Sequence, residues 1–153
     1  MISLQPVSAE NWRTLIQLKV REDQSHFVAS NLHSIAEAQF GFDDEGHWNS
    51  YPFGVYHNEE PVGFLMYAAN SAHSKIQVFV MRLMVDEKFQ GQGFGRRALE
   101  LALEKFRADQ ELRVVAISYS PDNVGAKKLY ADLGFKETGE MAGEELLATL
   151  NLC

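Results

Sequence analysis

Cysteine is almost absent from this sequence. The single cysteine among the 153 residues is Cys153, the last residue. A disulfide framework and a cysteine-based metal site within the chain are therefore excluded. Such a composition is typical of proteins in a reducing compartment, and we expect a cytoplasmic protein.

Long apolar runs are missing as well. No stretch approaches the roughly 18 apolar residues that a membrane-spanning helix needs. The first residues, MISLQPVSAENW, lack the basic segment followed by an apolar core that marks a secretory signal peptide. We therefore expect neither a membrane partner nor a secretion signal.

Basic residues are outnumbered by acidic ones, 14 to 21, and the formal net charge is −7. An acidic surface repels nucleic-acid phosphates and attracts cations, so we expect no nucleic-acid partner. Solubility alone would also explain this charge. The five histidines are not spaced as metal-ligand pairs such as H-x-x-x-H, and we expect no metal.

Hydrophobic residues make up 46% of the chain, which is enough for one core, and the length suits a single domain over residues 1–153. Hydrophobic periodicity predicts a mixed α/β domain. The expected strands are 2–6, 51–57, 61–69, 75–85, 113–119, 135–138 and 145–150, and the expected helices lie within 11–20, 24–42, 93–108 and 122–133. Ser34 and Glu37 have capping-box spacing, which would turn Ala36 and Phe40 inward.

The stretch KFQGQGFGRR, residues 88–97, places three glycines between an apolar strand and a helix. The first N–H groups of a helix have no partner, and the helix dipole puts partial positive charge there. Gly91, Gly93 and Gly95 would let these N–H groups approach phosphate oxygens. Arg96 and Arg97 would add positive charge at the rim, so the loop is typical of a diphosphate site.

Three interpretations of this loop compete. A dinucleotide-binding fingerprint needs G-x-G-x-x-G, whereas the glycines here run G-x-G-x-G. A P-loop needs G-x-x-x-x-G-K-[ST], which is absent. A purely structural turn is the third interpretation, and the loop alone leaves it open.

Two motifs in the right order resemble the GNAT family of N-acetyltransferases. The stretch from residue 83 to residue 99 resembles the family's central motif, in which Gln90, Gly93 and Gly95 match the loop pattern [RQ]-x-x-G-x-[GA]. The second match is Asn123 and Tyr130 with Ala126 between them, followed by Leu-Gly-Phe at 133–135. The similarity covers roughly residues 50–150.

This resemblance implies the GNAT fold, an α/β fold whose mixed, mostly antiparallel central sheet is splayed at a bulge and flanked by helices. It implies transfer of an acetyl group from acetyl-CoA to a primary amine by direct attack. The residues implied to bind the cofactor are Leu83, Met84, Val85, Gln90, Gly91, Gln92, Gly93, Phe94, Gly95, Arg96, Asn123 and Ala126.

The resemblance also makes Tyr130 the general acid that protonates the departing thiolate. A thiol has a pKa of about 8.5, so its thiolate leaves readily and the acid should contribute a factor of about 10²–10⁴. The alternative is an aromatic residue packed in the core with Leu129 and Leu133.

The acceptor amine must lose a proton, which costs about 4–5 kcal/mol at pH 7 for a pKa of about 10.4. Relatives that act on polyamines often carry a carboxylate two residues before the pantetheine-binding stretch, where this chain has Met81. Glu22 is the expected base, with Asp23 and His26 as alternatives. A solvated helix end would explain Glu22 and Asp23 equally well.

Residues 24–38 and 51–67 resemble bacterial spermine/spermidine N-acetyltransferases, which implies a polyamine acceptor. Acidic residues that would attract a polycation fall in this half of the chain: Glu22, Asp23, Glu37, Asp43, Asp44, Glu45, Glu59 and Glu60. The alternatives are an aminoglycoside, an amino acid or a protein amine as acceptor, or a non-catalytic acyl-CoA sensor. The resemblance also implies a homodimer.

Overall fold

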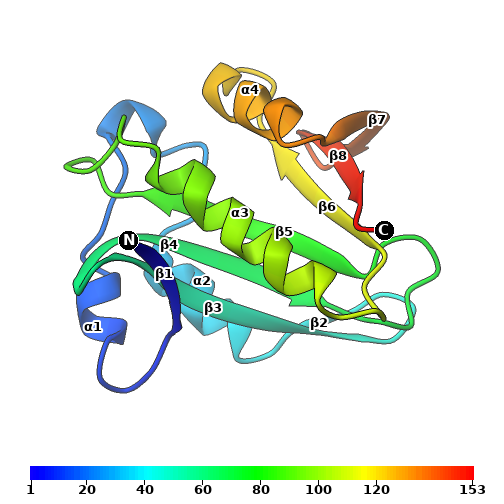
Figure 1. The fold of residues 1–153 in the computed structure, drawn as a ribbon, viewed down its shortest axis with the longest axis horizontal. Helices are drawn as coiled ribbons and strands as arrows, with labels where there is room; N and C mark the ends of the chain where they lie inside the picture. Colours follow the sequence, from blue (N-terminus) through cyan, green and yellow to red (C-terminus); the bar gives the residue numbers. More distant parts are fainter.

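The computed structural model describes all 153 residues (Figure 1). One open sheet has the strand order β1-β3-β4-β5-β6-β8-β7, with β2 paired only to β3. Neighbouring strands are antiparallel except β5 and β6, which are parallel. The strands are β1 Ile2–Pro6, β2 Phe42–Asp43, β3 His47–His57, β4 Glu60–Ala69, β5 Val78–Val85, β6 Val114–Tyr119, β7 Lys136–Ala142 and β8 Glu145–Asn151. The predicted fold class is confirmed.

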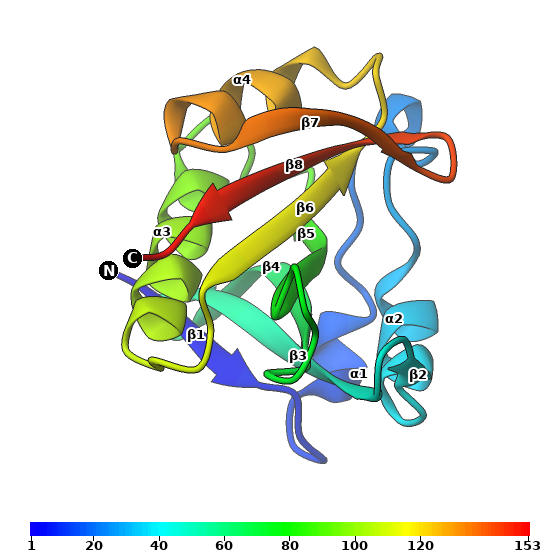
Figure 2. The same cartoon turned by 90° about the vertical axis from the view of Figure 1, so that its right-hand side faces the viewer.

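Helices cover both faces of the sheet (Figures 1 and 2). They are α1 Trp12–Leu15, α2 Asn31–Ala38, α3 Phe94–Arg107 and α4 Val124–Asp132, with a short 3-10 helix, η1, at Glu22–Gln24. The helix α3 crosses one face, and α1 and α2 lie on the other. The longest helix, α3, has 14 residues, and none of the helices has the length and hydropathy of a membrane span.

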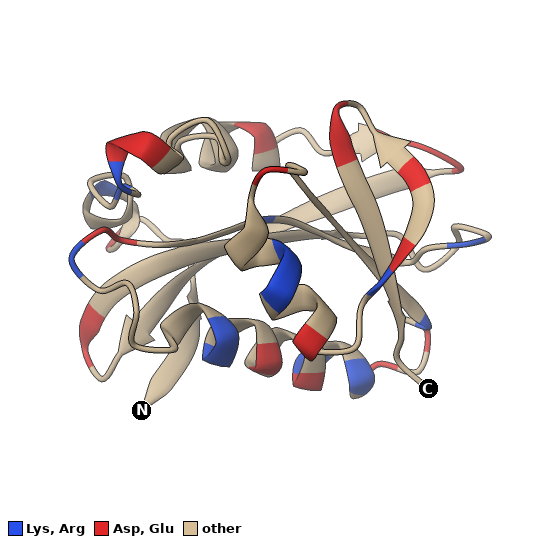
Figure 3. Cartoon of the chain, turned by 90° about the horizontal axis from the view of Figure 1, so that it is seen from above, with Lys and Arg blue, Asp and Glu red and all other residues tan.

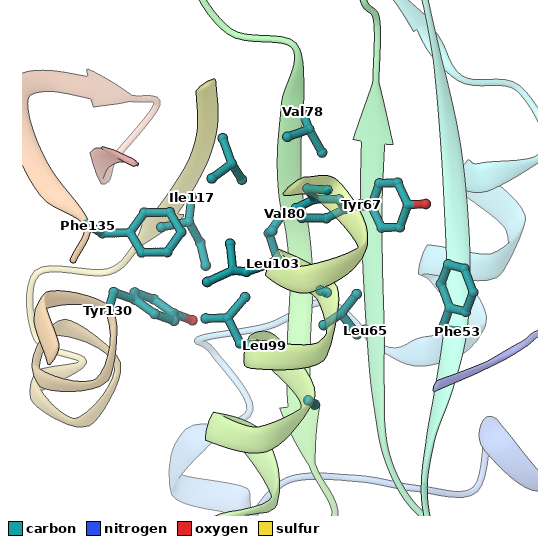
Figure 4. Packing of buried hydrophobic residues seen from close by; sticks show 14 of the residues in the cluster. Phe53, Leu65, Tyr67, Val78, Val80, Leu99, Leu103, Ile117, Tyr130 and Phe135 are labelled. Atoms are coloured by element: carbon teal, nitrogen blue, oxygen red, sulfur yellow. The ribbon is translucent and has the colours of Figure 1, made fainter. Parts of the chain in front are cut away.

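The main core fills the space between α3 and the sheet (Figure 4). Leu99, Leu103 and Phe106 recur at helical spacing and are buried against strand residues such as Leu65 and Ile117. Burying a side chain of this size contributes about 1.5–3 kcal/mol. A smaller cluster of Phe64, Met66 and Met84 lies on the opposite face, because side chains alternate between the faces of a strand.

The sheet splays between β5 and β6. These strands pair only over Val78–Val80 and Val115–Ile117. On the other side of β5, Met66 of β4 lies opposite Arg82 and Tyr67 lies opposite Val80, so Met81 is the extra residue of a bulge. A bulge bends and twists its strand. The stretch 81–85 is therefore left without a partner on its β6 side.

A connection between α1 and α2, residues 18–30, packs against the end of β5. We call it the strap. The backbone N–H of Lys19 donates to the buried carboxylate of Asp86 (3.0 Å), and the N–H of Glu87 donates to the carbonyl of Lys19 (2.8 Å). Further along the strap, Gln24 accepts a hydrogen bond from Gln90 (2.9 Å). The strap is thus held at two points beside the glycine-rich loop.

Several local predictions for the first half of the chain are wrong. The predicted capping box is not used, because α2 begins earlier and Ser30 caps it by accepting the N–H of His33 (3.1 Å). Ser34 therefore lies inside α2 and is buried, while Ala36 and Phe40 are exposed. The helix expected over 11–20 has only four residues, and the strand expected from residue 75 begins at Val78.

Candidate active site

The helix α3 begins with a left-handed residue, Gly93, at φ +80°. The first helical hydrogen bond runs from the N–H of Arg97 to the carbonyl of Gly93 (3.1 Å). The N–H groups of the three residues before Arg97 therefore have no partner within the helix. No acidic residue stands in the first turn, so these N–H groups and the helix dipole remain available to an external anion.

Packing and hydrogen bonds fix the loop on the end of β5. A Cβ on Gly95 would lie 3.4 Å from a methyl group of Val85, so a small residue lets α3 approach the strand closely. The side-chain amide of Gln90 donates to the carbonyl of Val85 (2.9 Å) and to the side chain of Gln24. Strand, loop and strap are therefore joined through one glutamine.

A cavity of about 350 Å³ lies between this loop, the strap, the free stretch of β5 and α4. We call it the first cavity. All the predicted cofactor-binding residues line it except Gln92 and Arg96, whose side chains are exposed. The apolar residues that also line it were not indicated by the sequence motifs: Val20, Phe27, Val28, Phe89 and Leu129. Their hydrophobicity is the one signal that could have indicated them.

The helix α4 holds Tyr130 at this cavity. Asn123 caps the helix by accepting the N–H of Ala126 (3.2 Å). Gly134, at φ +100°, ends it, and the N–H of Phe135 returns to the carbonyl of Tyr130 (3.0 Å). Figure 4 shows the Tyr130 ring reaching from α4 toward Leu99 of α3. The side chain is largely buried, with 8% of the residue exposed.

Burial raises the pKa of the Tyr130 hydroxyl well above its ordinary value, and the charges of Glu145 and Tyr119 raise it further. The desolvated phenolate is unfavourable, so the hydroxyl stays protonated at neutral pH. Tyr130 is therefore a hydrogen-bond and proton donor at the cavity, not a base.

A second cavity, also of about 350 Å³, adjoins the first, and the two share lining residues. Tyr130 and Asn123 line both cavities. Polar side chains on three strands line the second cavity: Arg82 on β5, Ser118 on β6 and Glu145 at the start of β8. The strap contributes His26. The cavities also share Phe27, Val28 and Leu83, so they meet along a boundary that includes Tyr130.

The structure does not bring Glu22 together with Tyr130. Glu22 lies in the 3-10 helix of the strap, is exposed, and lines a separate cavity of about 450 Å³ that Tyr130 does not line. Asp23 is exposed and pairs with Arg21 at 3.5 Å. Of the two alternatives to Glu22, only His26 lines a cavity shared with Tyr130.

Acidic residues are spread around the molecule (Figure 3), and none of the predicted acidic set lines the second cavity. Glu59 and Glu60 lie at the turn between β3 and β4. A further cavity, which we call the neighbouring cavity, shares Arg82 and Glu145 with the second cavity. Asp44 is the one member of the predicted acidic set that lines this neighbouring cavity.

One trio has the composition of a metal site: Asp44, Glu45 and His73, whose ligand atoms lie within 4.8 Å of one another. The Nδ1 atom of His73 accepts the N–H groups of Lys75 (3.2 Å) and Ile76 (3.1 Å). The ring proton is therefore on Nε2, which lies 3.3 Å from each carboxylate. This nitrogen carries the ring proton and lies at ion-pair distance from both carboxylates, so it has no lone pair for a metal.

Comparison with known proteins identifies the family. The model of the Acetyltransferase (GNAT) family matches residues 12–135. The chain belongs to this family. It is an acetyltransferase that uses acetyl-CoA, as GNAT enzymes do.

Two curated relatives from Bacillus subtilis are similar over most of their length. The spermine/spermidine N(1)-acetyltransferase of strain 168 is 25% identical over 144 residues, which are 92% of this chain and 91% of the relative. A probable spermine N(1)-acetyltransferase of the subspecies natto is 24% identical over the same shares.

Solved structures share the fold. Spermidine N-acetyltransferase from Vibrio cholerae, in complex with CoA and spermine, has a TM-score of 0.73 at 16% identity, covering 99% of this chain and 95% of that one. The aminoglycoside acetyltransferase AAC(6')-Ib with coenzyme A has a TM-score of 0.76 at 15% identity with the same coverage. Enzymes for different amines thus share this architecture.

Proposed function

We propose that this acetyltransferase moves the acetyl group of acetyl-CoA onto a primary amine of a polyamine such as spermine or spermidine, with Tyr130 as general acid. The observation that carries the proposal is that Tyr130 lines both cavities. A thioester in the first cavity and an amine in the second would meet at its hydroxyl. Direct transfer needs this arrangement, because the two reacting atoms must come within about 3–3.5 Å.

The first cavity suits coenzyme A in two ways. The free N–H groups at the start of α3 would receive the diphosphate. The unpaired stretch 81–85 of β5 offers backbone N–H and C=O groups, which the amides of pantetheine would use as a neighbouring strand does. At Gly91 and Gly93 a Cβ would meet no atom within 4 Å, so the loop leaves open space on this side.

The reaction moves two protons off the acceptor nitrogen. The ammonium first loses a proton, and the nitrogen lone pair then forms a C–N bond with the thioester carbonyl carbon. The C–S bond breaks, and the hydroxyl of Tyr130 gives its proton to the departing sulfur. Tyr130 recovers a proton from the new amide nitrogen through solvent. The products are an acetamide, coenzyme A as the thiol, and one proton.

The high pKa of Tyr130 defines how it helps. A thiol has a pKa of about 8.5, so full proton transfer from a buried tyrosine to a free thiolate is uphill. The hydroxyl is therefore most effective while the C–S bond breaks and negative charge develops on sulfur in a site from which water is excluded. The contribution we assign to Tyr130 is a hydrogen bond aimed at that sulfur, along which the proton passes as the C–S bond breaks.

Two observations support a polyamine. Both Bacillus subtilis relatives are named for spermine, over nine-tenths of this chain. The net charge of −7 attracts polycations over long range. An aminoglycoside would be attracted in the same way, so charge alone does not separate these two acceptors.

Arg82 favours a second candidate, an acceptor that also carries a carboxylate, such as an amino acid or a peptide. Its guanidinium lines the second cavity, donates to the carbonyl of Met81 (2.9 Å) and lies 3.4 Å from Glu37. Its Nε atom is buried and has no hydrogen-bond partner. The positive charge of Arg82 at this cavity would attract a substrate carboxylate and repel an ammonium group.

The experiment is a comparison of kcat/KM for thiol release from acetyl-CoA with spermidine, spermine, kanamycin, lysine and a short peptide. The polyamine proposal expects spermidine or spermine to exceed the others by at least tenfold. A preference for lysine or the peptide would instead identify the acceptor as an amine that also carries a carboxylate. Binding of acetyl-CoA without turnover of any amine would support the non-catalytic sensor.

A homodimer and a cytoplasmic location are also part of the proposal. The edge strand β7 is exposed along most of its length, and an unpaired strand edge suits association with a second copy. Sedimentation of the purified protein tests the dimer directly.

A further inference from the structure

Glu145 is the one carboxylate in the second cavity. It is the first residue of β8, directly after the turn from β7. The pairing of β8 with β6 ends next to it, where Tyr119 lies opposite Leu146. Glu145 thus lies at the open end of the splay, where the cavity forms, and none of the family motifs in the sequence includes it.

A hydrogen bond orients this carboxylate. The hydroxyl of Ser118 donates to Oε1 of Glu145 (2.8 Å). The second oxygen, Oε2, makes no hydrogen bond or ion pair with the protein. One oxygen is therefore held by β6, and the other is free for a group in the cavity.

Electrostatic coupling indicates that Glu145 and Tyr130 act on the same space. The negative charge of Glu145 raises the pKa of the Tyr130 hydroxyl. Such coupling is effective between groups that share a poorly solvated region. Tyr130 and this carboxylate therefore line one cavity and are electrostatically coupled.

We propose that Glu145 binds the acceptor ammonium and takes its proton, which makes it the base of the reaction. This inference rests on the proposed function and replaces Glu22, which lies outside this cavity. The proton passes from the ammonium nitrogen to Oε2 and then to solvent, while the neutral nitrogen attacks the thioester. Glu145 returns to its charged form in each turnover.

The charged and titratable groups around Glu145 are compatible with this role. Arg82 of β5 faces the same cavity, but Glu37 and the carbonyl of Met81 hold its guanidinium. The other titratable groups that face it are Tyr119 on β6, Tyr130 on α4 and His26 on the strap, with Asp44 and His73 in the neighbouring cavity. Because Arg82 has its own carboxylate partner, Glu145 remains available to an ammonium.

The neighbouring cavity, of about 420 Å³, would hold the rest of the acceptor. It shares Met81, Arg82, Ser118 and Glu145 with the second cavity. Trp48 and Phe42, stacked with ring centroids 5.4 Å apart, line it together with Asp44. Aromatic faces and a carboxylate attract ammonium groups, so a chain of amines extending from Glu145 meets favourable chemistry there.

The test compares Glu145→Gln with Glu144→Gln, an exposed neighbour in the same turn. With spermidine, or the best amine of the panel, we expect E145Q to lower kcat by about 10²-fold or more. The wild-type kcat should fall at low pH, because a protonated base cannot accept the ammonium proton. This fall should be absent in E145Q. Acetyl-CoA binding should be unchanged in both variants, and E144Q should match the wild type.

The outcomes distinguish a failure of this inference from a failure of the proposed function. Equal kcat and equal pH profiles for E145Q and E144Q would overturn the inference alone. A wild-type enzyme that acetylates none of the amines would overturn the proposed function and the inference with it. If E145Q does not fold, Glu145→Asp decides: the inference expects a lowered kcat with the low-pH limb retained, and wild-type kinetics would overturn it.

Discussion

The side-chain amide of Gln90 lies 2.9 Å from the carbonyl oxygen of Val85 and donates a hydrogen bond to it. The same amide donates to Gln24 at 2.9 Å. Val85 ends β5, Gln90 belongs to the glycine-rich loop and Gln24 belongs to the strap. A single amide therefore joins three segments that line the first cavity.

Replacing Gln90 by alanine should weaken acetyl-CoA binding. A hydrogen bond of this kind contributes about 0.5–1.5 kcal/mol, and two are lost, so we expect Kd to rise by up to roughly 5- to 150-fold. Isothermal titration calorimetry measures this directly. The control is Gln92→Ala, because Gln92 is exposed and does not line the cavity. Equal affinities for the two variants would contradict the role of Gln90.

Replacing Gly93 by alanine should reduce both stability and acetyl-CoA affinity. At φ +80° an alanine costs about 1–2 kcal/mol, and no atom lies within 4 Å of the added Cβ. The loss therefore comes from backbone strain. Gly139, at φ +85° with equal space but in β7, is the matched control. We expect similar losses in the free energy of unfolding, measured with denaturant, and weaker acetyl-CoA binding only for G93A.

Replacing Tyr130 by phenylalanine should lower kcat by about 10²–10⁴-fold with little change in KM for acetyl-CoA. The ring that packs beside Phe135 is kept, and only the donor to sulfur is removed. Tyr67→Phe is the control, since Tyr67 is buried but lines neither of the two cavities. An unchanged kcat for Y130F would show that Tyr130 is only a core aromatic residue.

The protein should lose stability at alkaline pH. Desolvation raises the pKa of Tyr67 and of Tyr119 to about 12, the latter helped by its hydrogen bond to Glu137, and raises the pKa of Tyr130 further. In the unfolded chain these groups ionise near pH 10. Above that pH the unfolded state binds fewer protons, so stability is full below pH 10 and falls as pH rises through about 12.

Denaturant unfolding at pH 8, 10 and 11 measures this loss. Each buried tyrosine contributes up to about 1.4 kcal/mol per pH unit in that window. In the Tyr67→Phe variant, the free energy of unfolding should fall less steeply with pH, by up to the contribution of one tyrosine. A free energy of unfolding that is constant from pH 8 to pH 11 would contradict the assigned burial of all three tyrosines.

Most residues that line the first cavity could be predicted from the sequence because this part of the molecule is built locally. Gln90, Gly93 and Gly95 lie within one loop, and their residue types follow from backbone geometry at a strand-to-helix turn. The order of most strands, and the cap at Gly134, also follow from local periodicity and turn chemistry. Such features depend on neighbours in the sequence and can be read from it.

The lining of the second cavity could not be predicted in the same way. Its polar groups, Arg82, Ser118 and Glu145, come from three strands and meet only because β5 and β6 separate at the bulge of Met81. The position of Glu22 in the chain indicates the acceptor region, but the strap places its side chain at another cavity. The missed start of α2 has a similar cause, since Ser30 and Ser34 are both competent caps and tertiary packing decides between them.

The most direct test of the account is a grid of initial rates, with acetyl-CoA and spermidine each varied at several fixed concentrations of the other. Two cavities that meet at Tyr130 require both substrates to be bound together, so the double-reciprocal lines should intersect. Parallel lines would mean that the acetyl group first passes to the enzyme, which would contradict direct attack across Tyr130.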